Sequence, residues 1–378
     1  LVPACTAVSR KAALVAMQHD GRVVAMIGGR SYKTSPYNRA TQAERQPGSA
    51  FKLAVYLAAI EDGETPDTLV ENSPLTIDGW SPKNYGGRYG GPTTLRSAFA
   101  QSSNVAAVRI AERVGLDMVA DTARRLGITA AITPGPSMAL GTSGMSLIEL
   151  TSAYAVIASG RYPVKASGLA DSSPASRRSM DPRVREAMLD LLWTATNQGT
   201  GRGAALGIPT FGKTGTTQNH RDAVFVGFAG GLVTGVWVGN DDDTPMRGVT
   251  GGTLPAAIWA RFMSAAQLRA SDLDLPPTLM AAIEQRQAAM RVAAEERELA
   301  ELEAAEAADQ LHDGSPVERF IEGVADFLRG DREAHTDEAG TDATIAAEEE
   351  AREQRRARLD ELRQRKAERE AVFGQEGE

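Results

Sequence analysis

The 378-residue sequence contains little cysteine and little histidine, and both shortages limit the chemistry available to it. Its one cysteine, Cys5, excludes an internal disulfide framework and a cysteine-based zinc cluster. Its four histidines are His19, His220, His312 and His335, and the last two lie in a highly charged C-terminal stretch. A Ser-His-Asp triad or a histidine-rich metal site would therefore have to be built from His19 and His220.

The sequence also has no long apolar run and no recognisable targeting segment. No eighteen consecutive residues are apolar, so no membrane-spanning helix is predicted within these residues. The chain opens with Leu1-Val2-Pro3, without an initiator methionine or a signal peptide. We therefore expect a fragment of a longer protein, and its first residues do not indicate where the protein works.

Charge is distributed unevenly along the chain, whose formal net charge is −8. Residues 1–280 contain 27 Lys and Arg against 22 Asp and Glu, a net of +5, whereas residues 281–378 contain 14 against 27, a net of −13. The first part is long enough to bury a core and has an ordinary apolar content. The pattern predicts a compact body followed by an acidic, solvated appendage.

The appendage is rich in Ala, Glu and Arg. Residues 279–311 and 346–371 are predicted helices, and the second has many Glu–Arg pairs three or four positions apart, which support an exposed helix. Residues 317–328 form a short amphipathic segment between them. Composition favours a solvated helix or disorder over a coiled coil, because the apolar seam is thin. No partner for this tail is predicted.

The body begins and ends with strand patterns. Residues 13–17 and 22–27 are β-rich runs joined by Asp20-Gly21, a strong hairpin signal. A short strand ending at Lys213 is followed by strands over residues 223–229 and 232–238. Helices are predicted for residues 49–60, 94–100, 105–114, 116–126, 146–158, 183–196 and 254–268. Residues 62–92 and 165–181 are predicted loops. This order predicts one antiparallel sheet assembled from both ends of the body.

One segment matches a nucleotide-binding pattern without its context. Residues 207–214 fit G-x-x-x-x-G-K-[ST], the phosphate-binding loop. Such a loop follows a buried strand and leads into a helix whose N-terminus faces the phosphate. Here glycine-rich sequence precedes the motif, and Gly and β-branched residues follow it. A nucleotide-binding ATPase is therefore kept only as an alternative.

A serine and a lysine three positions apart suggest nucleophilic chemistry. Ser49 and Lys52 would share one face of the predicted helix and lie within reach of one another. A serine is a poor nucleophile until a base takes its proton, and Lys52 is the candidate base. A lysine can serve only if its pKa falls, which burial and a second cation such as Lys213 both promote. Taken alone, such a pair is more often a helix cap and a solvated lysine.

Two further segments complete the pattern. Ser102-Ser103-Asn104 lies between predicted helices, and Lys213-Thr214-Gly215-Thr216 lies at the end of a predicted strand. Serine and asparagine are common turn residues, and a lysine at a strand end is often only solvated. The specific signal is therefore the order S-x-x-K, S-x-N, K-T-G along one body.

With these motifs, residues 8–270 resemble the transpeptidase domain of class A penicillin-binding proteins, within the serine DD-peptidase and β-lactamase superfamily. Leu53 and Val224 depart from the family, which often has Pro and Trp there, and neither carries a reacting group. The resemblance rests on four stretches of sequence: Arg45-Gln46-Pro47-Gly48-Ser49-Ala50-Phe51-Lys52, Asn38-Arg39-Ala40, Trp80-Ser81-Pro82-Lys83-Asn84 and residues 222–242.

The resemblance implies an α/β (α+β) fold with a five-stranded antiparallel sheet flanked by helices and a helical subdomain across the active-site cleft. It places the transpeptidase domain at residues 1–272 and the charged tail at residues 273–378. The family's upstream parts, a membrane anchor and a glycosyltransferase domain, are expected to be missing from this fragment.

The resemblance also implies a role for each motif residue. Ser49 would attack the carbonyl between the last two D-alanines of a stem peptide, and Lys52 would take its proton. Ser102 would relay a proton toward the leaving D-alanine, while Asn104 would hold Lys52 and the substrate amide. Lys213, as the second lysine of the site, would bind the terminal carboxylate.

The strand around Lys213 would bind substrate. Thr214, Gly215 and Thr216 belong to this substrate-binding stretch, and both threonines would contact the terminal carboxylate. The backbone N–H groups of Ser49 and Thr216 would form the oxyanion hole, where one donor is typically worth a few kcal/mol.

The implied function is peptidoglycan cross-linking, with covalent penicillin binding at Ser49. Stem peptides and β-lactams are the expected partners, no nucleic acid, metal or cofactor is implied, and the expected location is the outer face of the bacterial inner membrane, through the missing anchor. A DD-carboxypeptidase, a serine β-lactamase and a non-enzymatic β-lactam sensor remain alternatives. No role is assigned to His220, Trp80, Tyr85 or Tyr89, which are compatible with loop packing as well as with the cleft.

Overall fold

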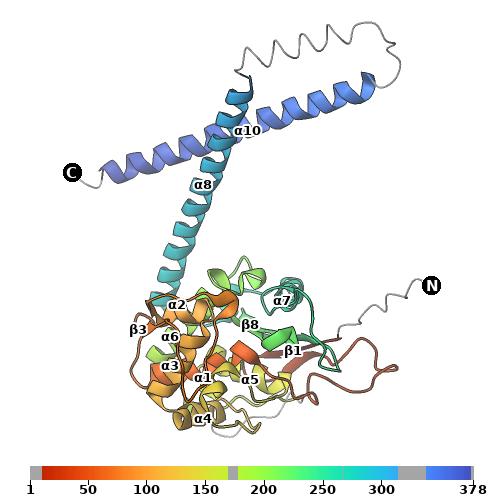
Figure 1. The fold of residues 1–378 in the computed structure, drawn as a ribbon, viewed down its shortest axis with the longest axis vertical. Coiled ribbons are helices and arrows are strands. Elements are labelled where there is room, and N and C mark those ends of the chain that lie inside the picture. The colour runs from red at the N-terminus through yellow and green to blue at the C-terminus, as the bar shows by residue number, and fades with distance from the viewer. Residues whose placement is uncertain (1–10, 169–177, 267, 314–337, 376–378) are drawn as a thin grey trace. The chain divides into compact units, whose positions relative to one another are not determined.

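The computed structural model describes residues 11–168, 178–266, 268–313 and 338–375 (Figure 1). The chain divides into two compact units, Leu1–Leu279 and Met280–Glu378. Cys5, the predicted segment 317–328 and much of the predicted loop 165–181 lie outside the described residues.

A five-stranded antiparallel sheet with the order β2-β1-β9-β8-β7 forms the centre of the first unit. The first and last strands of the body pair directly, from Lys11 opposite Gly239 to Gln18 opposite Leu232. This confirms the predicted sheet assembled from both ends. The strands are β1 (Lys11–Gln18), β2 (Val23–Ile27), β7 (Phe211–Thr216), β8 (Asp222–Ala229) and β9 (Leu232–Gly239).

Helices cover both faces of this sheet. A side chain at Gly235 would strike Thr151 of α5 (Leu147–Ser159), whereas the side-chain hydroxyl of the preceding Thr234 donates to Met263 Sδ of α7 (Leu254–Ala265) at 3.1 Å. Successive strand residues face opposite sides, so α5 and α7 lie on opposite faces. Trp259 of α7 also packs against the buried side chains of β8 and β9.

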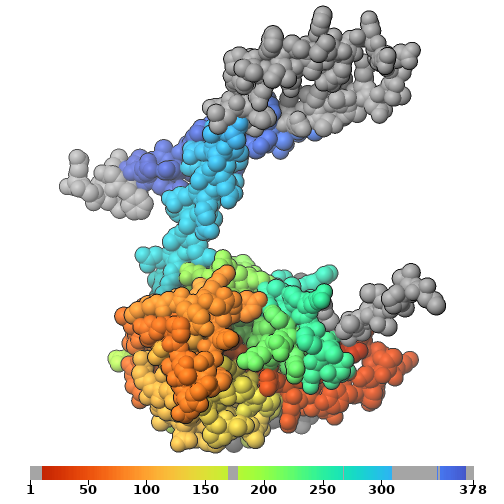
Figure 2. Space-filling view, viewed as in Figure 1, coloured from red at the N-terminus to blue at the C-terminus, as the bar shows by residue number. Residues whose placement is uncertain are grey.

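The remaining helices of the body pack around α1 (Lys52–Glu61), in which every residue from Lys52 to Ile60 is buried. A helix that is buried all round must lie inside a cluster of other helices. Figure 2 shows the orange surface of the earlier part of this unit bordering the green surface of its later part. The other helices are α2 (Leu95–Ala100), α3 (Asn104–Val114), α4 (Leu116–Arg125) and α6 (Pro182–Asn197).

Several predicted boundaries were wrong. The predicted strand ending at Lys213 continues to Thr216, because pairing with β8 continues to Thr216 opposite Ala223. The predicted helix 49–60 begins as the 3₁₀ turn η1 (Gly48–Phe51), and α7 ends at Ala265 instead of residue 268.

The predicted loops contain short elements that depend on distant partners. A two-stranded sheet joins β3 (Leu69–Glu71) to β4 (Pro92–Thr94), and a second joins β5 (Arg161–Tyr162) to β6 (Arg178–Ser179). The 3₁₀ turn η2 (Tyr85–Gly87) lies in the first of these regions. Three-residue strands carry too little periodicity to be recognised in a Gly- and Pro-rich sequence.

Two long helices carry the acidic appendage, α8 (Pro277–Asp313) and α10 (Glu338–Gln375). Both helices were predicted, but with shorter limits. Their leucines Leu299, Leu359 and Leu362 form one small buried cluster. Arg358 Nε donates to Glu298 Oε1 at 2.8 Å beside this cluster. The described part of the chain contains no helix with the length and apolar content needed to span a membrane.

Candidate active site

Two glycines let the turn that carries Ser49 approach strand β7. A β-carbon at Gly215 would lie 2.1 Å from the carbonyl oxygen of Pro47. Gly48 has φ +52°, and a β-carbon there would lie 2.9 Å from the carbonyl oxygen of Thr216. At Gly48 only glycine fits both the left-handed backbone and the close approach, and at Gly215 the close approach alone excludes a side chain. Ser49 in η1 therefore lies against the Gly215–Thr216 end of β7, and two of the three motifs meet.

Lys52 joins the first motif to the second. The side chain is fully buried. Its Nζ donates hydrogen bonds to three oxygens: the carbonyl of Ser102 at 2.8 Å, the carbonyl of Ser103 at 3.0 Å and Oδ1 of Asn104 at 2.8 Å. The three oxygens can only accept here, so their arrangement suits an ammonium group with all three N–H bonds directed at them.

Lys213 joins the third motif to the second. It is also fully buried, and its Nζ donates to Ser102 Oγ at 2.9 Å and to the Thr214 carbonyl at 3.3 Å. The ammonium lies 5.6 Å from the centre of the Phe99 ring, a cation–π distance. Ser102 thus contacts both lysines, Lys52 through its carbonyl and Lys213 through its hydroxyl.

The backbone of Ser102 is held in an unusual conformation, with φ +57°. Serine rarely adopts positive φ, and residues held there by their surroundings are concentrated at functional sites. The turn aims the carbonyl at Lys52 and the hydroxyl at Lys213. The strain supports a role for this turn beyond connecting α2 to α3.

Burial lowers the pKa of both lysines, because a charged ammonium loses its hydration in the interior. The pKa of Lys52 falls well below 10.5, first through burial and then through the positive charge of Lys213. The pKa of Lys213 falls to about 7 through burial. Two lysines with lowered pKa values therefore lie on either side of Ser102.

Asn84 holds the second motif in place. Its Oδ1 accepts hydrogen bonds from the backbone N–H of Asn104 at 2.8 Å and of Val105 at 3.1 Å, the first two of helix α3. The backbone carbonyl of the preceding residue, Lys83, accepts from Asn104 Nδ2 at 2.7 Å, which leaves Oδ1 of Asn104 facing Lys52. The sequence marked Asn84 only as part of a resembling stretch, since no spacing rule links it to a residue twenty positions away.

The threonines of β7 are hydrogen-bonded to neighbouring segments. The Thr214 and Thr200 hydroxyls lie 2.7 Å apart, and Thr216 Oγ1 accepts from the Gly251 N–H at 3.0 Å. These contacts fix the direction of both side chains along the strand. The predicted substrate contacts of Thr214, Gly215 and Thr216 remain predictions.

Ser49 itself is half-buried. In a 3₁₀ turn, residues i and i+3 lie directly above one another, which suits the predicted pairing of Ser49 with Lys52. Within the described residues, no hydrogen bond joins Ser49 Oγ to Lys52 Nζ. Proton transfer from Ser49 to Lys52 therefore remains a prediction.

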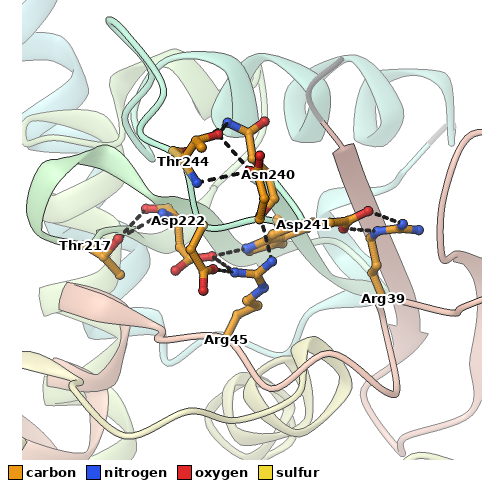
Figure 3. A network of polar contacts seen from close by, with 10 residues as sticks. Arg39, Arg45, Thr217, Asp222, Asn240, Asp241 and Thr244 are labelled. Atoms are coloured by element: carbon orange, nitrogen blue, oxygen red, sulfur yellow. Dashed lines mark hydrogen bonds and ion pairs between the residues drawn. The ribbon is translucent and has the colours of Figure 1, made fainter. Parts of the chain in front are cut away.

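Arginines and aspartates form a network of ion pairs and hydrogen bonds around Arg45, four positions before Ser49 (Figure 3). Arg45 forms ion pairs with Asp222 and Asp243, and Arg39 Nε donates to Asp241 Oδ1 at 2.7 Å. A cavity of about 10 Å³, room for one water molecule, is lined by Arg39 and Arg45 and by other residues that include none of the motif residues. The sequence marked these arginines and aspartates only as members of resembling stretches, because no spacing rule links partners about two hundred positions apart.

His220 lies at the rim of the loop after β7. Its Nδ1 is 3.0 Å from the Val249 carbonyl, and its ring meets Tyr85 edge-on with centres 6.3 Å apart. No hydrogen bond joins it to the motif residues within the described chain.

Two alternative kinds of site lack support in the structure. Among all the described residues, no three His, Cys, Asp or Glu side chains cluster as metal ligands would. The phosphate-loop alternative also lacks its context, since Lys213 lies inside strand β7 with no long helix after it.

Residues 12–231 match the protein family described as penicillin binding protein transpeptidase domain. The chain belongs to the penicillin-binding protein transpeptidase family. Among the curated relatives of this chain, penicillin-binding protein 1A of Neisseria lactamica is 37% identical to it over 270 residues. The match covers 64% of this chain and 34% of the relative. Penicillin-binding protein 1A of Aquifex aeolicus is 35% identical over 278 residues, covering 68% and 38%.

Solved structures of penicillin-binding proteins share the fold of this family member. The crystal structure of penicillin-binding protein 1A from Haemophilus influenzae matches with a TM-score of 0.61 at 29% identity, covering 71% of this chain and 49% of that chain. The PonA1 protein from Mycobacterium tuberculosis, in complex with penicillin V, matches with a TM-score of 0.62 at 28% identity, covering 71% and 80%. The predicted fold class is therefore confirmed. The chain spans about a third of the length of the N. lactamica relative.

Proposed function

We propose that this chain is a peptidoglycan DD-transpeptidase that transfers an acyl group through Ser49. The observation that carries the proposal is the contact of Ser102 with two buried lysines, Lys52 and Lys213. Burying two lysines, one from α1 and one from β7, against the same short turn is unfavourable for folding. A site that moves protons and binds a carboxylate gives them a use.

In the proposed first step, Ser49 Oγ attacks the carbonyl carbon of the penultimate D-alanine while its proton passes to Lys52. The lowered pKa of Lys52 makes the neutral amine, which can accept this proton, easier to form than it is for a lysine in water. When the C–N bond breaks, the leaving amine of the last D-alanine takes a proton by way of Ser102. The ester on Ser49 is then attacked by an amine of a neighbouring stem peptide, which forms the cross-link and frees Ser49.

The proposed oxyanion hole consists of the backbone N–H groups of Ser49 and Thr216. The approach of η1 to β7 at Gly48 and Gly215 supports it, because it brings the two segments together. Lys213, Thr214 and Thr216 are the proposed ligands of the terminal carboxylate. Penicillin resembles the acyl-D-Ala-D-Ala unit, and we propose that it acylates Ser49 in the same site.

We also propose that residues 1–272 form the transpeptidase domain and residues 273–378 a tail whose partner is unidentified. The proposed workplace is the outer face of the bacterial inner membrane, where stem peptides are cross-linked. An anchor and a glycosyltransferase domain upstream belong to the same proposal.

Labelling with a fluorescent penicillin tests the function. We expect covalent labelling of the protein, its loss in Ser49→Ala, and its retention in Ser264→Ala, a matched change on the exposed side of α7. Undiminished labelling of Ser49→Ala would refute the assignment. Rapid loss of label would favour a serine β-lactamase, and hydrolysis of a D-Ala-D-Ala peptide without cross-linking to an added amine would favour a DD-carboxypeptidase.

A further inference from the structure

Arg45, four positions before the proposed nucleophile Ser49, joins its segment to the end of the sheet where β7 ends and β8 begins. Its Nη2 donates to the carbonyl oxygen of Asn240 at 2.7 Å. Its Nη1 forms ion pairs with Asp243 and, at 3.7 Å, with Asp222. The guanidinium also lies over the Trp237 ring, 5.1 Å from its centre. One side chain therefore contacts the start of β8, the end of β9 and the loop that follows.

Asp222 carries this contact on to the strand of the proposed oxyanion hole. It is buried, and its Oδ1 accepts a hydrogen bond from Trp237 Nε1 at 2.8 Å. Its backbone N–H donates to Thr217 Oγ1 at 2.8 Å, and its carbonyl accepts from the Thr217 N–H at 3.0 Å. Thr217 directly follows Thr216 in the chain. A continuous set of polar contacts thus links Arg45 with the residue next to Thr216.

The backbone of Arg45 is fixed as well. Its N–H and carbonyl exchange hydrogen bonds with those of Met145, both at 3.0 Å. The side chain and the backbone of Arg45 are therefore both held, so the segment that enters η1 is anchored before it reaches Ser49. An anchored segment holds the amide of Ser49 at a fixed place relative to β7.

We propose that Arg45 and Asp222 are positioning residues that set the separation of the Ser49 and Thr216 amides. This rests on the proposed acyl transfer through Ser49. Oxyanion donors act only when both lie about 3 Å from the developing negative oxygen, and displacements near 1 Å lower rates strongly. Arg45 is partly buried, and its planar guanidinium combines directional contacts with oxygen acceptors and stacking on Trp237, which together restrict such displacement.

The pair Arg39–Asp241 provides a matched control in the same network. Arg39 is 5% exposed, and it donates to Asp241 at 2.7 and 2.5 Å. It is therefore at least as well paired as Arg45. Its other acceptors are the carbonyls of Gly28 and Tyr37 and the hydroxyl of Ser35, which lie in the loop after β2 and not beside η1 or β7.

The test measures penicillin acylation of the full chain, separating the acylation rate constant from the dissociation constant of the initial complex. We expect Arg45→Met to lower the rate constant about 10- to 100-fold with less than a threefold change in the dissociation constant, since one whole oxyanion donor is worth about 10²- to 10³-fold. Arg45→Lys should recover part of the loss. Arg39→Met should lower the melting temperature comparably but change the rate constant less than about threefold.

Asp222→Asn keeps the size of the side chain and its acceptor for Trp237, so it serves if Arg45→Met does not fold. It should lower the acylation rate constant, and the double variant with Arg45→Lys should lose no more than the worse single variant. Three results would overturn the proposal. Asp222→Asn could leave the acylation rate constant unchanged, or the losses of the two single variants could multiply in the double variant. Arg39→Met could also lower the rate constant as much as Arg45→Met does. Failure of the wild type to be acylated at Ser49 would instead overturn the proposed function.

Discussion

Replacing Lys213 by methionine removes one of two neighbouring buried cations and tests how strongly burial perturbs them. Methionine fills a similar volume without a charge. Lys213 is fully buried, and its ammonium bonds to the Ser102 hydroxyl. The substitution therefore removes a titratable group from the interior and one positive charge from the surroundings of Lys52.

The magnitude follows from the pKa of Lys213, which burial lowers from 10.5 to about 7. An unfolded chain with a pKa near 10.5 binds more protons than the folded chain between these two values. The free energy of unfolding therefore rises with pH from about 7 to about 10.5, by at most about 1.4 kcal/mol per pH unit for this group. Below pH 7 both states are protonated and this contribution is constant.

Urea unfolding at pH 7, 8 and 9 measures the effect as the difference between wild type and Lys213→Met. The wild type should gain stability relative to the variant as pH rises, approaching about 1 kcal/mol per unit above pH 8. Lys33→Met, at an exposed lysine, is the control and should follow the wild type. Equal pH slopes in wild type and Lys213→Met would refute a lowered pKa at Lys213.

The same variant has a second, catalytic readout. The charge of Lys213 contributes to the low pKa of Lys52, so its removal should raise that pKa. If Lys52 is the base, any residual penicillin acylation should begin to rise at higher pH than in the wild type. A pH profile that keeps its midpoint would show that the two lysines do not interact.

Two further substitutions test the support of the site. Asn84→Ala leaves the backbone N–H groups of Asn104 and Val105 without their acceptor and should lower the free energy of unfolding by about 1–3 kcal/mol, as measured in urea. Unchanged stability in Asn84→Ala would contradict the contact. Gly215→Ala forces a methyl group against the Pro47 carbonyl and should lower stability by about 1–3 kcal/mol together with acylation. Gly207→Ala, which meets open space, should change stability by less than about 0.5 kcal/mol, so equal effects of the two would argue against close packing of η1 on β7.

Elements with strong local patterns were predictable from the sequence. Strand β9 and helix α5 are rich in apolar residues and flanked by clear turn signals, and their predicted limits differ from the structure by about a residue. The prediction ended strand β7 at Lys213 because Gly215 has weak strand propensity alone. Pairing with β8 outweighs that propensity.

The candidate site divides in the same way. Spacing placed Ser49 and Lys52 together because three residues along a helix are neighbours in any fold. The hydrogen bonds from Lys52 to Ser102 and Asn104 span about fifty residues and depend on how α1 packs against α3. Motif order and family resemblance, rather than a physical rule read along the chain, indicated that these residues meet.

The sequence by itself therefore determined the local elements, the charge division between body and tail, and the residue types of the chemistry. Only the tertiary structure decided that Lys52 and Lys213 are fully buried on either side of Ser102, and that Arg45 reaches Asp222. The physical reason is that burial, and with it the lowered pKa values, is a property of packed surroundings. Those surroundings come from segments that lie far apart in the chain.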